Sequence, residues 1–318
     1  YYRVVPGCIC FSDLGTGIRR RPASGIRSPP FAHGKQLLED LTTTPARVHV
    51  MNVVVVGATG TIGQATVRAL ADDGAQVLAV GRSNAPLHSL AAKNVSLLSC
   101  DLGSRSSAVD IASSARALWP RVDGLVVAAG RHGPIGPVRD LTRTGLSDYL
   151  DEHLVSVVSL IGELATALDA AEQPSIVLFS GGGATGPRPR YTPYALAKVA
   201  LVRLVENIAL EEPGWRVNAV APGFVASGIH ESSLAAGQER SGEDPDELRR
   251  RLLAAEGPER AVALVRFLLG PESVGISGRL VSAVWDPWDD PSWQDVLKQS
   301  ESLGRIRRID GVQFGEIH

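Results

Sequence analysis

A serine, a tyrosine and a lysine within residues 180–198 (SGGGATGPRPRYTPYALAK) are the side chains of this chain best suited to do chemistry. Ser180 directly follows the apolar run SIVLF, and Tyr194 precedes Lys198 by one helical turn. Residues four apart on a helix share one face, so the phenol and the ammonium would lie together. A tyrosine pKa is ordinarily about 10, and a neighbouring positive charge lowers it towards neutrality. We therefore expect Tyr194 to act as general acid and base, with Ser180 holding the oxygen of a substrate.

A second chemical signature is the stretch GATGTIG at residues 57–63, directly after the apolar run NVVVV. Gly57, Gly60 and Gly63 permit a tight turn, close approach of a pyrophosphate, and close packing of a helix on the strand. The first N–H groups of that helix would face the phosphates. Because the glycines follow a strand and open a helix, they predict a dinucleotide-binding site.

The residues after the second apolar run indicate which dinucleotide is bound. An NAD site usually has an acidic residue there, which accepts hydrogen bonds from the adenosine ribose. The sequence AVGRSN has none, but offers Arg82 and Ser83, which can bind a 2′-phosphate. This pattern favours NADP(H) over NAD(H), the alternative being that Arg82 is a solvated loop residue. Asp101, after the third run, could accept from the adenine amino group or cap the helix that follows.

The elements that must position these residues follow from the apolar pattern. Short, nearly continuous apolar runs are typical of parallel strands that are covered on both faces. Their alternation with helical stretches predicts an α/β fold, a doubly wound and mostly parallel sheet of the Rossmann type in a single domain. Ligands of such sheets bind beyond the carboxyl ends of the strands, where Ser180, Gly130 and residues 222–227 are expected. The predicted strands are 52–56, 76–80, 95–99, 124–128, 175–179, 215–220 and 279–284, and the predicted helices 61–73, 104–118, 145–171 and 192–212.

The domain boundaries come from changes in this rhythm. Residues 1–50 lack periodicity and contain Arg19, Arg20 and Arg21, so we interpret them as an extension outside the core, or as a basic targeting peptide. The Rossmann domain is expected over 51–285, with a polar helical insertion at 228–258 that is a candidate substrate lid. Residues 286–318 are interpreted as a C-terminal tail.

Composition excludes several classes of function. The 318 residues are 44% hydrophobic and 21% charged, with a net charge of −2, which gives no electrostatic reason to expect a nucleic acid or an anionic membrane as partner. No apolar run approaches the roughly 20 residues of a membrane span. The three cysteines, Cys8, Cys10 and Cys100, make a poor disulfide or zinc framework. We expect a cytoplasmic protein without a metal site.

Over nearly all of residues 52–285 the chain resembles the short-chain dehydrogenase/reductase family. The matching motifs are VVGATGTIG, CDL at 100–102, AAG at 128–130, Ser180, YALAK and NAVAPGFVAS. The resemblance implies a catalytic set of Ser180, Tyr194 and Lys198, with the lysine also holding the nicotinamide ribose. It further implies a seven-stranded sheet and a homodimer or homotetramer. On the same basis the cofactor would contact Gly57, Thr59, Gly60, Thr61, Ile62, Gly63, Arg82, Ser83, Asp101, Leu102, Ala129, Gly130, Tyr194, Lys198, Pro222, Gly223, Val225 and Ser227, the last at the nicotinamide carboxamide.

Three positions depart from the family pattern. The glycine spacing is GxxGxxG, so Thr61 occupies the usual place of the middle glycine. The family's NNAG is reduced to VAAG. His153, in DEHLVS, stands where the family often has the asparagine of its proton relay. It could relay protons through its imidazole or be a satisfied interhelical histidine.

These observations lead to one principal function and two alternatives. The first is an NADP(H)-dependent oxidoreductase that interconverts a secondary alcohol and a ketone. The second is a nucleotide-sugar epimerase or dehydratase of the extended branch of the family, and the third a non-catalytic NADP-sensing protein. The insertion lacks an apolar stripe long enough for an acyl chain, which favours a small polar or sugar-like substrate carrying a carbonyl or an alcohol.

Overall fold

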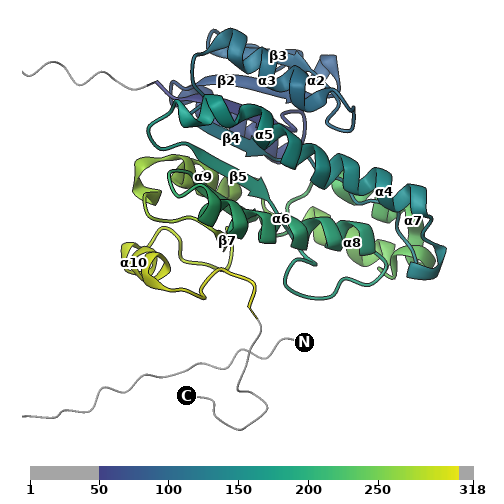
Figure 1. The fold of residues 1–318 in the computed structure, drawn as a ribbon. Helices are drawn as coiled ribbons and strands as arrows, with labels where there is room; N and C mark the ends of the chain where they lie inside the picture. The colour runs from purple at the N-terminus through teal and green to yellow at the C-terminus, as the bar shows by residue number, and fades with distance from the viewer. Residues whose placement is uncertain (1–49, 308–318) are drawn as a thin grey trace, which may run out of the picture. The chain divides into compact units, whose positions relative to one another are not determined.

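Seven strands form one parallel sheet in the order β3-β2-β1-β4-β5-β6-β7, which confirms the predicted Rossmann architecture (Figure 1). The computed structural model describes residues 50–307, so almost all of the predicted extension 1–50, including Cys8 and Cys10, and residues 308–318 lie outside the described part. The strands are β1 Asn52–Val56, β2 Gln76–Gly81, β3 Val95–Ser99, β4 Gly124–Val127, β5 Ser175–Phe179, β6 Arg216–Ala221 and β7 Arg279–Ser282.

The core lies on both faces of this sheet, because successive valines of each strand point to opposite sides. Val54 and Val56 face one layer of helices, whereas Val53 and Val55 face the other. The first layer is formed by α3 (Ser107–Leu118), α5 (Ser156–Asp169) and α6 (Thr192–Glu211). The second contains α1 (Thr61–Asp72), α2 (Asn84–His88), α9 (Glu259–Leu269) and α10 (Pro291–Gln299). This two-sided burial explains why the strands have continuous apolar sequences.

The strand order places a switch point between β1 and β4. The chain proceeds outward from β1 through β2 to β3, then returns to the other side of β1 and continues to β7. The crossover segments that leave β1 and β4 therefore diverge and leave a crevice beyond their carboxyl ends. Helices α4 (Arg143–Leu150), α7 (Glu231–Ser241) and α8 (Pro245–Leu253) gather on the right of the view in Figure 1.

The helix predicted over 145–171 is interrupted. A π-helical turn, Asp151–Val155, separates α4 from α5. The Ser156 hydroxyl donates to the carbonyls of Asp151 and Glu152, and His153 Nδ1 lies 3.1 Å from the Tyr149 carbonyl. Side chains thus occupy carbonyls at the place where the helical ladder is interrupted, which is a recognised cause of local distortion.

The segment after β7, predicted only as a polar tail, contains the helix α10. Asp290 caps this helix by accepting from the Ser292 amide at 2.8 Å, and Pro291 occupies the first helical position. Trp288 and Leu297 are buried in the core cluster that α10 shares with α1 and α9, and the Leu280 amide of β7 donates to the Gly304 carbonyl at 2.6 Å. Within residues 50–307, none of the helices has the length and apolar character to cross a membrane.

Asn218, fully buried on β6, binds the start of the edge strand β7 through its side-chain amide. Its Nδ2 donates to the Ile276 carbonyl at 2.8 Å, and its Oδ1 accepts from the Arg279 amide at 3.1 Å. Replacing it with leucine would leave two buried backbone groups unpaired, at about 1–3 kcal/mol each. We predict that Asn218→Leu lowers the free energy of unfolding, measured in urea, by about 2–6 kcal/mol. Asn84→Leu, at the exposed start of α2, is the control and should cost far less.

Candidate active site

The carboxyl ends of the strands open into a groove of about 1290 Å³. This is larger than the roughly 300–1,000 Å³ of a typical small-molecule pocket, so a dinucleotide and a substrate can share it. Two predicted residues lie outside its lining: Ser83 is the N-cap of α2, and Gly63 packs under the turn. The predicted residues that line it are Gly57, Thr59, Gly60, Thr61, Ile62, Arg82, Asp101, Leu102, Ala129, Gly130, His153, Ser180, Tyr194, Lys198, Pro222, Gly223, Val225 and Ser227.

The glycine turn at one end fits a pyrophosphate. Gly57 has a φ of +85°, and a Cβ there would lie 2.4 Å from the Ala129 amide nitrogen. A Cβ on Gly63 would lie 2.1 Å from the Gly57 carbonyl oxygen, so α1 can pack on β1 only with glycine at this position. Gly60 differs, since its added Cβ would make only an ordinary contact at 3.5 Å. Gly60 is the N-cap of α1 without a side-chain cap, so it leaves the first N–H groups open to a phosphate.

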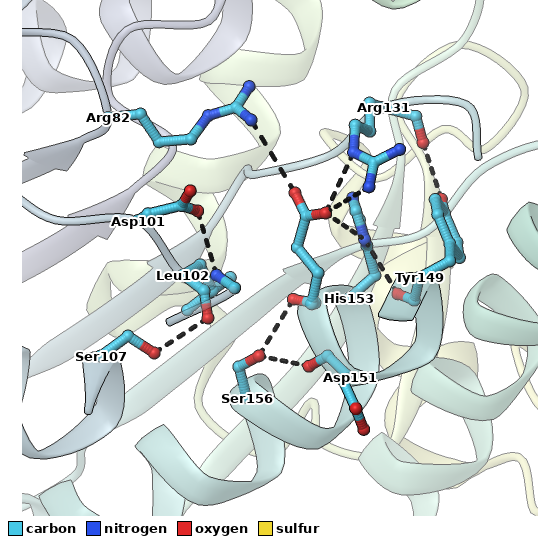
Figure 2. Close-up of polar contacts among 11 residues, drawn as sticks. Arg82, Asp101, Leu102, Ser107, Arg131, Tyr149, Asp151, His153 and Ser156 are labelled. Atoms are coloured by element: carbon cyan, nitrogen blue, oxygen red, sulfur yellow. Dashed lines mark hydrogen bonds and ion pairs between the residues drawn. The ribbon is translucent and has the colours of Figure 1, made fainter. Parts of the chain in front are cut away.

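Two arginines and a glutamate meet at the predicted adenosine end. Arg131 Nη2 and Nε lie 2.5 and 3.0 Å from Glu152 Oε2, and Arg82 Nη1 lies 4.0 Å from Glu152 Oε1. The dashed lines from Arg82 and Arg131 in Figure 2 mark these ion pairs. The π-helical turn carries Glu152 into the groove. Arg82 is therefore the partner of a carboxylate as well as a candidate phosphate ligand.

Asp101 does not cap the following helix. Its Oδ1 accepts from the Gly103 amide at 3.1 Å, and α3 begins only at Ser107. Of the two sequence interpretations, the capping one is wrong, because the loop turns before the helix begins. Asp101 lines the groove beside Leu102, where the adenine contact is predicted (Figure 2).

The predicted catalytic residues meet at the other end. Ser180, Tyr194 and Lys198 are each no more than 6% exposed. Lys198 Nζ donates to the Phe179 carbonyl at 2.8 Å, and the Ser180 hydroxyl donates to the Lys198 carbonyl at 3.3 Å. The lysine thus fastens α6 to the end of β5. A Cβ on Gly181 would lie 2.4 Å from the Tyr194 hydroxyl oxygen, so glycine at this position makes room for the phenol.

The electrostatics differ from the sequence-based expectation. Burial raises the pKa of Tyr194, and the nearby charge that lowers this pKa is the guanidinium of Arg188. The Arg188 guanidinium carbon lies 5.2 Å from the Tyr194 ring centroid, and Lys198 Nζ 5.6 Å. Burial also lowers the pKa of Lys198 to about 8. In the protein alone desolvation outweighs the charges around the phenol, so the expected lowering of the tyrosine pKa stays a prediction for the complex with an oxidised, positively charged nicotinamide.

His153 is buried and packed. Its ring stacks on Tyr149 at 4.2 Å, and its Nδ1 must donate to the Tyr149 carbonyl, since a carbonyl only accepts (Figure 2). Burial lowers the pKa of His153 to about 4, so the imidazole is neutral at pH 7. These contacts fit the interhelical interpretation, although the ring also lines the groove.

Sequence reasoning missed a polar cluster beside Tyr194. His132 Nδ1 lies 2.9 Å from Ser233 Oγ, and the Tyr191 hydroxyl donates to Glu243 Oε2 at 2.7 Å. Ser233 and Glu243 belong to the predicted insertion, so the insertion is bound to the loops that follow β4 and β5. The available signal was weak: a histidine two residues after AAG and a tyrosine three residues before Tyr194.

Comparison with known proteins gives the family. The family model of short chain dehydrogenases matches residues 51–237. Dehydrogenase/reductase SDR family member 4 of Oryctolagus cuniculus is 26% identical over 236 residues, which are 72% of this chain and 90% of that protein. A short chain dehydrogenase of Salmonella enterica serovar Typhi has a TM-score of 0.65 at 23% identity, covering 74% of this chain and 96% of that one. Another, from Shigella flexneri 2a in complex with NADP, has a TM-score of 0.62 at 21% identity, covering 73% and 96%.

The chain therefore belongs to the short-chain dehydrogenase family. It is an oxidoreductase that acts with a nicotinamide dinucleotide on small molecules, as the curated relatives and the family model indicate. These two solved structures are less than 25% identical to this chain, and they support the fold.

The buried ammonium of Lys198 should destabilise the protein in the absence of ligands. A pKa lowered from 10.5 to about 8 corresponds to about 3 kcal/mol. The unfolded chain holds this proton up to about pH 10.5, so the penalty is fully present below about pH 8 and is relieved between the two values. Lys198→Met should raise the free energy of unfolding at pH 7 by about 1–3 kcal/mol, less at pH 9.5. Lys93→Met, at an exposed lysine, is the control. An equal gain in the free energy of unfolding of Lys198→Met at both pH values would contradict the prediction.

Proposed function

We propose that this protein is an NADP(H)-dependent oxidoreductase that interconverts a secondary alcohol and a ketone, with Tyr194 passing the proton. The observation that carries this proposal is the convergence of Tyr194, Lys198 and Ser180 at one end of a groove. The other end of the same groove has the glycine turn and an open helix N-terminus. A hydride carrier and a proton donor can therefore act on one small molecule between them.

In this proposal each side chain has a separate task. The dinucleotide, when bound, exchanges a hydride with the substrate carbon. Ser180 orients the substrate oxygen, and Tyr194 donates a proton to it during ketone reduction. The raised pKa of Tyr194 suits this direction, because the phenol is protonated at neutral pH. Lys198 would hold the nicotinamide ribose, and Ser227 the carboxamide.

The NADP(H) preference rests on the charges at the adenosine end. The end of β2 carries Arg82 and no carboxylate. Arg131 adds a second guanidinium nearby, with Glu152 between the two. A 2′-phosphate carries more negative charge than one carboxylate and can recruit both arginines. Glu152 would then compete with the phosphate for Arg82.

The proton-transfer role is tested by removing the phenolic hydroxyl alone. Tyr194→Phe should lower kcat by roughly 10²–10⁴, the usual contribution of general acid–base catalysis, and spare cofactor affinity in a fluorescence titration. Ser180→Ala should cost less, and Lys198→Ala should impair both quantities. One ionisation in the pH profile of wild-type kcat/KM should vanish in Tyr194→Phe. Near-native kcat in Tyr194→Phe would mean that the proton comes from elsewhere, with His153 the first residue to test.

Cofactor preference is tested by the ratio of kcat/KM for NADPH and NADH. Wild-type enzyme should favour NADPH, and Arg82→Ala should weaken NADPH while sparing NADH. Glu152→Gln should tighten NADPH binding, because it frees both arginines from a competing carboxylate. A wild-type enzyme that prefers NADH tenfold would contradict the assignment, as would weaker NADPH binding in a folded Glu152→Gln.

A further inference from the structure

Arg188 is a half-buried cation on the substrate side of the groove. It comes from the loop between β5 and α6, and its guanidinium carbon lies 4.1 Å from the Tyr191 ring centroid and 5.2 Å from that of Tyr194. Its side chain is 24% exposed and lines the groove. The charge therefore faces the space that a molecule reacting at Tyr194 must enter.

The guanidinium is poorly satisfied by the protein. Within residues 50–307 its side chain makes one hydrogen bond, from Nη1 to His132 Nε2 at 3.3 Å. Burial, with the charge of Arg188, lowers the pKa of His132 to about 3, so this imidazole is a neutral acceptor. The nearest carboxylate oxygen, Glu243 Oε1, is 3.7 Å from Nη2, beyond hydrogen-bonding distance. Glu243 Oε2 instead accepts a hydrogen bond from the Tyr191 hydroxyl at 2.7 Å.

An arginine has five N–H donors in a planar fork that matches a carboxylate. The other cations of the groove near Tyr194 are placed differently: Lys198 is bonded to the Phe179 carbonyl, and Arg251 is exposed and lies over the Phe224 ring at 4.3 Å. Arg188 is thus the guanidinium beside the phenol, the one whose charge acts on Tyr194, and most of its donors are open.

We propose that the substrate carries a carboxylate, which Arg188 binds while the carbonyl oxygen accepts a hydrogen bond from Tyr194. This inference rests on the proposed function and adds the substrate class, an oxo acid and the corresponding hydroxy acid. Since the guanidinium is so close to the Tyr194 ring, the carboxylate must lie within a few bonds of the reacting carbon. In the reduction, hydride adds to the carbonyl carbon and the proton of Tyr194 to its oxygen, and the carboxylate is unchanged.

The test compares acids with their uncharged methyl esters. 2-Oxobutanoate, 4-oxopentanoate and their methyl esters are titrated calorimetrically into enzyme loaded with NADP⁺, which cannot reduce them. Wild type should bind at least one acid about tenfold more tightly than its ester, the worth of one charge-assisted contact. In Arg188→Met that preference should fall below about threefold, with ester affinity nearly unchanged, and Arg188→Lys should retain part of it because it keeps the charge without the fork.

Arg190→Met is the matched control. Arg190 lies two residues away in the same loop, and its Nη1 donates to the Glu239 carbonyl at 2.9 Å, so it also ties the loop to the insertion. It lies outside the groove lining, so Arg190→Met should keep the preference for acids. Loss of the preference in both variants would show that the loop, and not the Arg188 charge, is responsible.

The inference is overturned if wild type binds acids and esters alike, or if folded Arg188→Met keeps the tenfold preference. Failure of the proposed function has a different signature. Selective binding of the acids with no NADPH consumption on any ketone would sink the oxidoreductase proposal and leave the carboxylate site. Equal turnover of acids and esters would contradict the carboxylate site and leave the oxidoreductase proposal standing.

Discussion

The close approach of the end of β1 to the end of β4 is the constraint on which the remaining geometry depends. A side chain on Gly57 would collide with the Ala129 backbone, and one on Gly63 with the Gly57 carbonyl. The turn after β1 can therefore lie against the neighbouring strand only if both positions are glycine. That contact places the N-terminus of α1 at the crevice of the switch point, where Gly60 and Thr61 line the groove.

Burial dominates the chemistry at the opposite end. Tyr194 and Lys198 are both withdrawn from water, which raises the pKa of the phenol and lowers that of the ammonium. Each shift disfavours the charged form, so the protein alone holds the tyrosine protonated and tolerates the lysine at a cost in stability. Such a site is typical of functional rather than structural demands on a fold. In the proposed reaction the positive charges of the oxidised nicotinamide and of Arg188 would lower the pKa of Tyr194, against the effect of desolvation.

The features that could be predicted from the sequence are those that depend on neighbouring residues along the chain. The valine runs predicted the strands because both faces of the sheet are covered, and the glycine spacing predicted the tight turn between β1 and α1 because backbone contacts require glycine there. The interruption at Asp151–Val155 was missed, since it depends on which carbonyls His153 and Ser156 capture. The helix α10 was missed although Asp290 and Pro291 carry its start signal, because the tryptophan-rich stretch around it has no period. Contacts between distant segments, such as Arg131 with Glu152, have no sequence signature at all.

Backbone geometry forms one end of the groove, and side-chain contacts form the other. A family resemblance therefore predicts the first end better than the second. The end with the glycine turn is built from backbone and glycines, whose spacing is visible in the sequence. The end with Tyr194 is held by side chains from three segments: His132 after β4, Tyr191 before α6, and Ser233 and Glu243 in the insertion. Arg190 supports this junction with a left-handed backbone at φ +73°, and its carbonyl accepts from the Gly136 amide at 2.8 Å. A strained non-glycine residue persists only where its surroundings fix it, at roughly 1–3 kcal/mol. In the proposed carboxylate contact, discrimination between substrates therefore comes from Arg188 and the loops and insertion around it, and not from the motifs shared with the family.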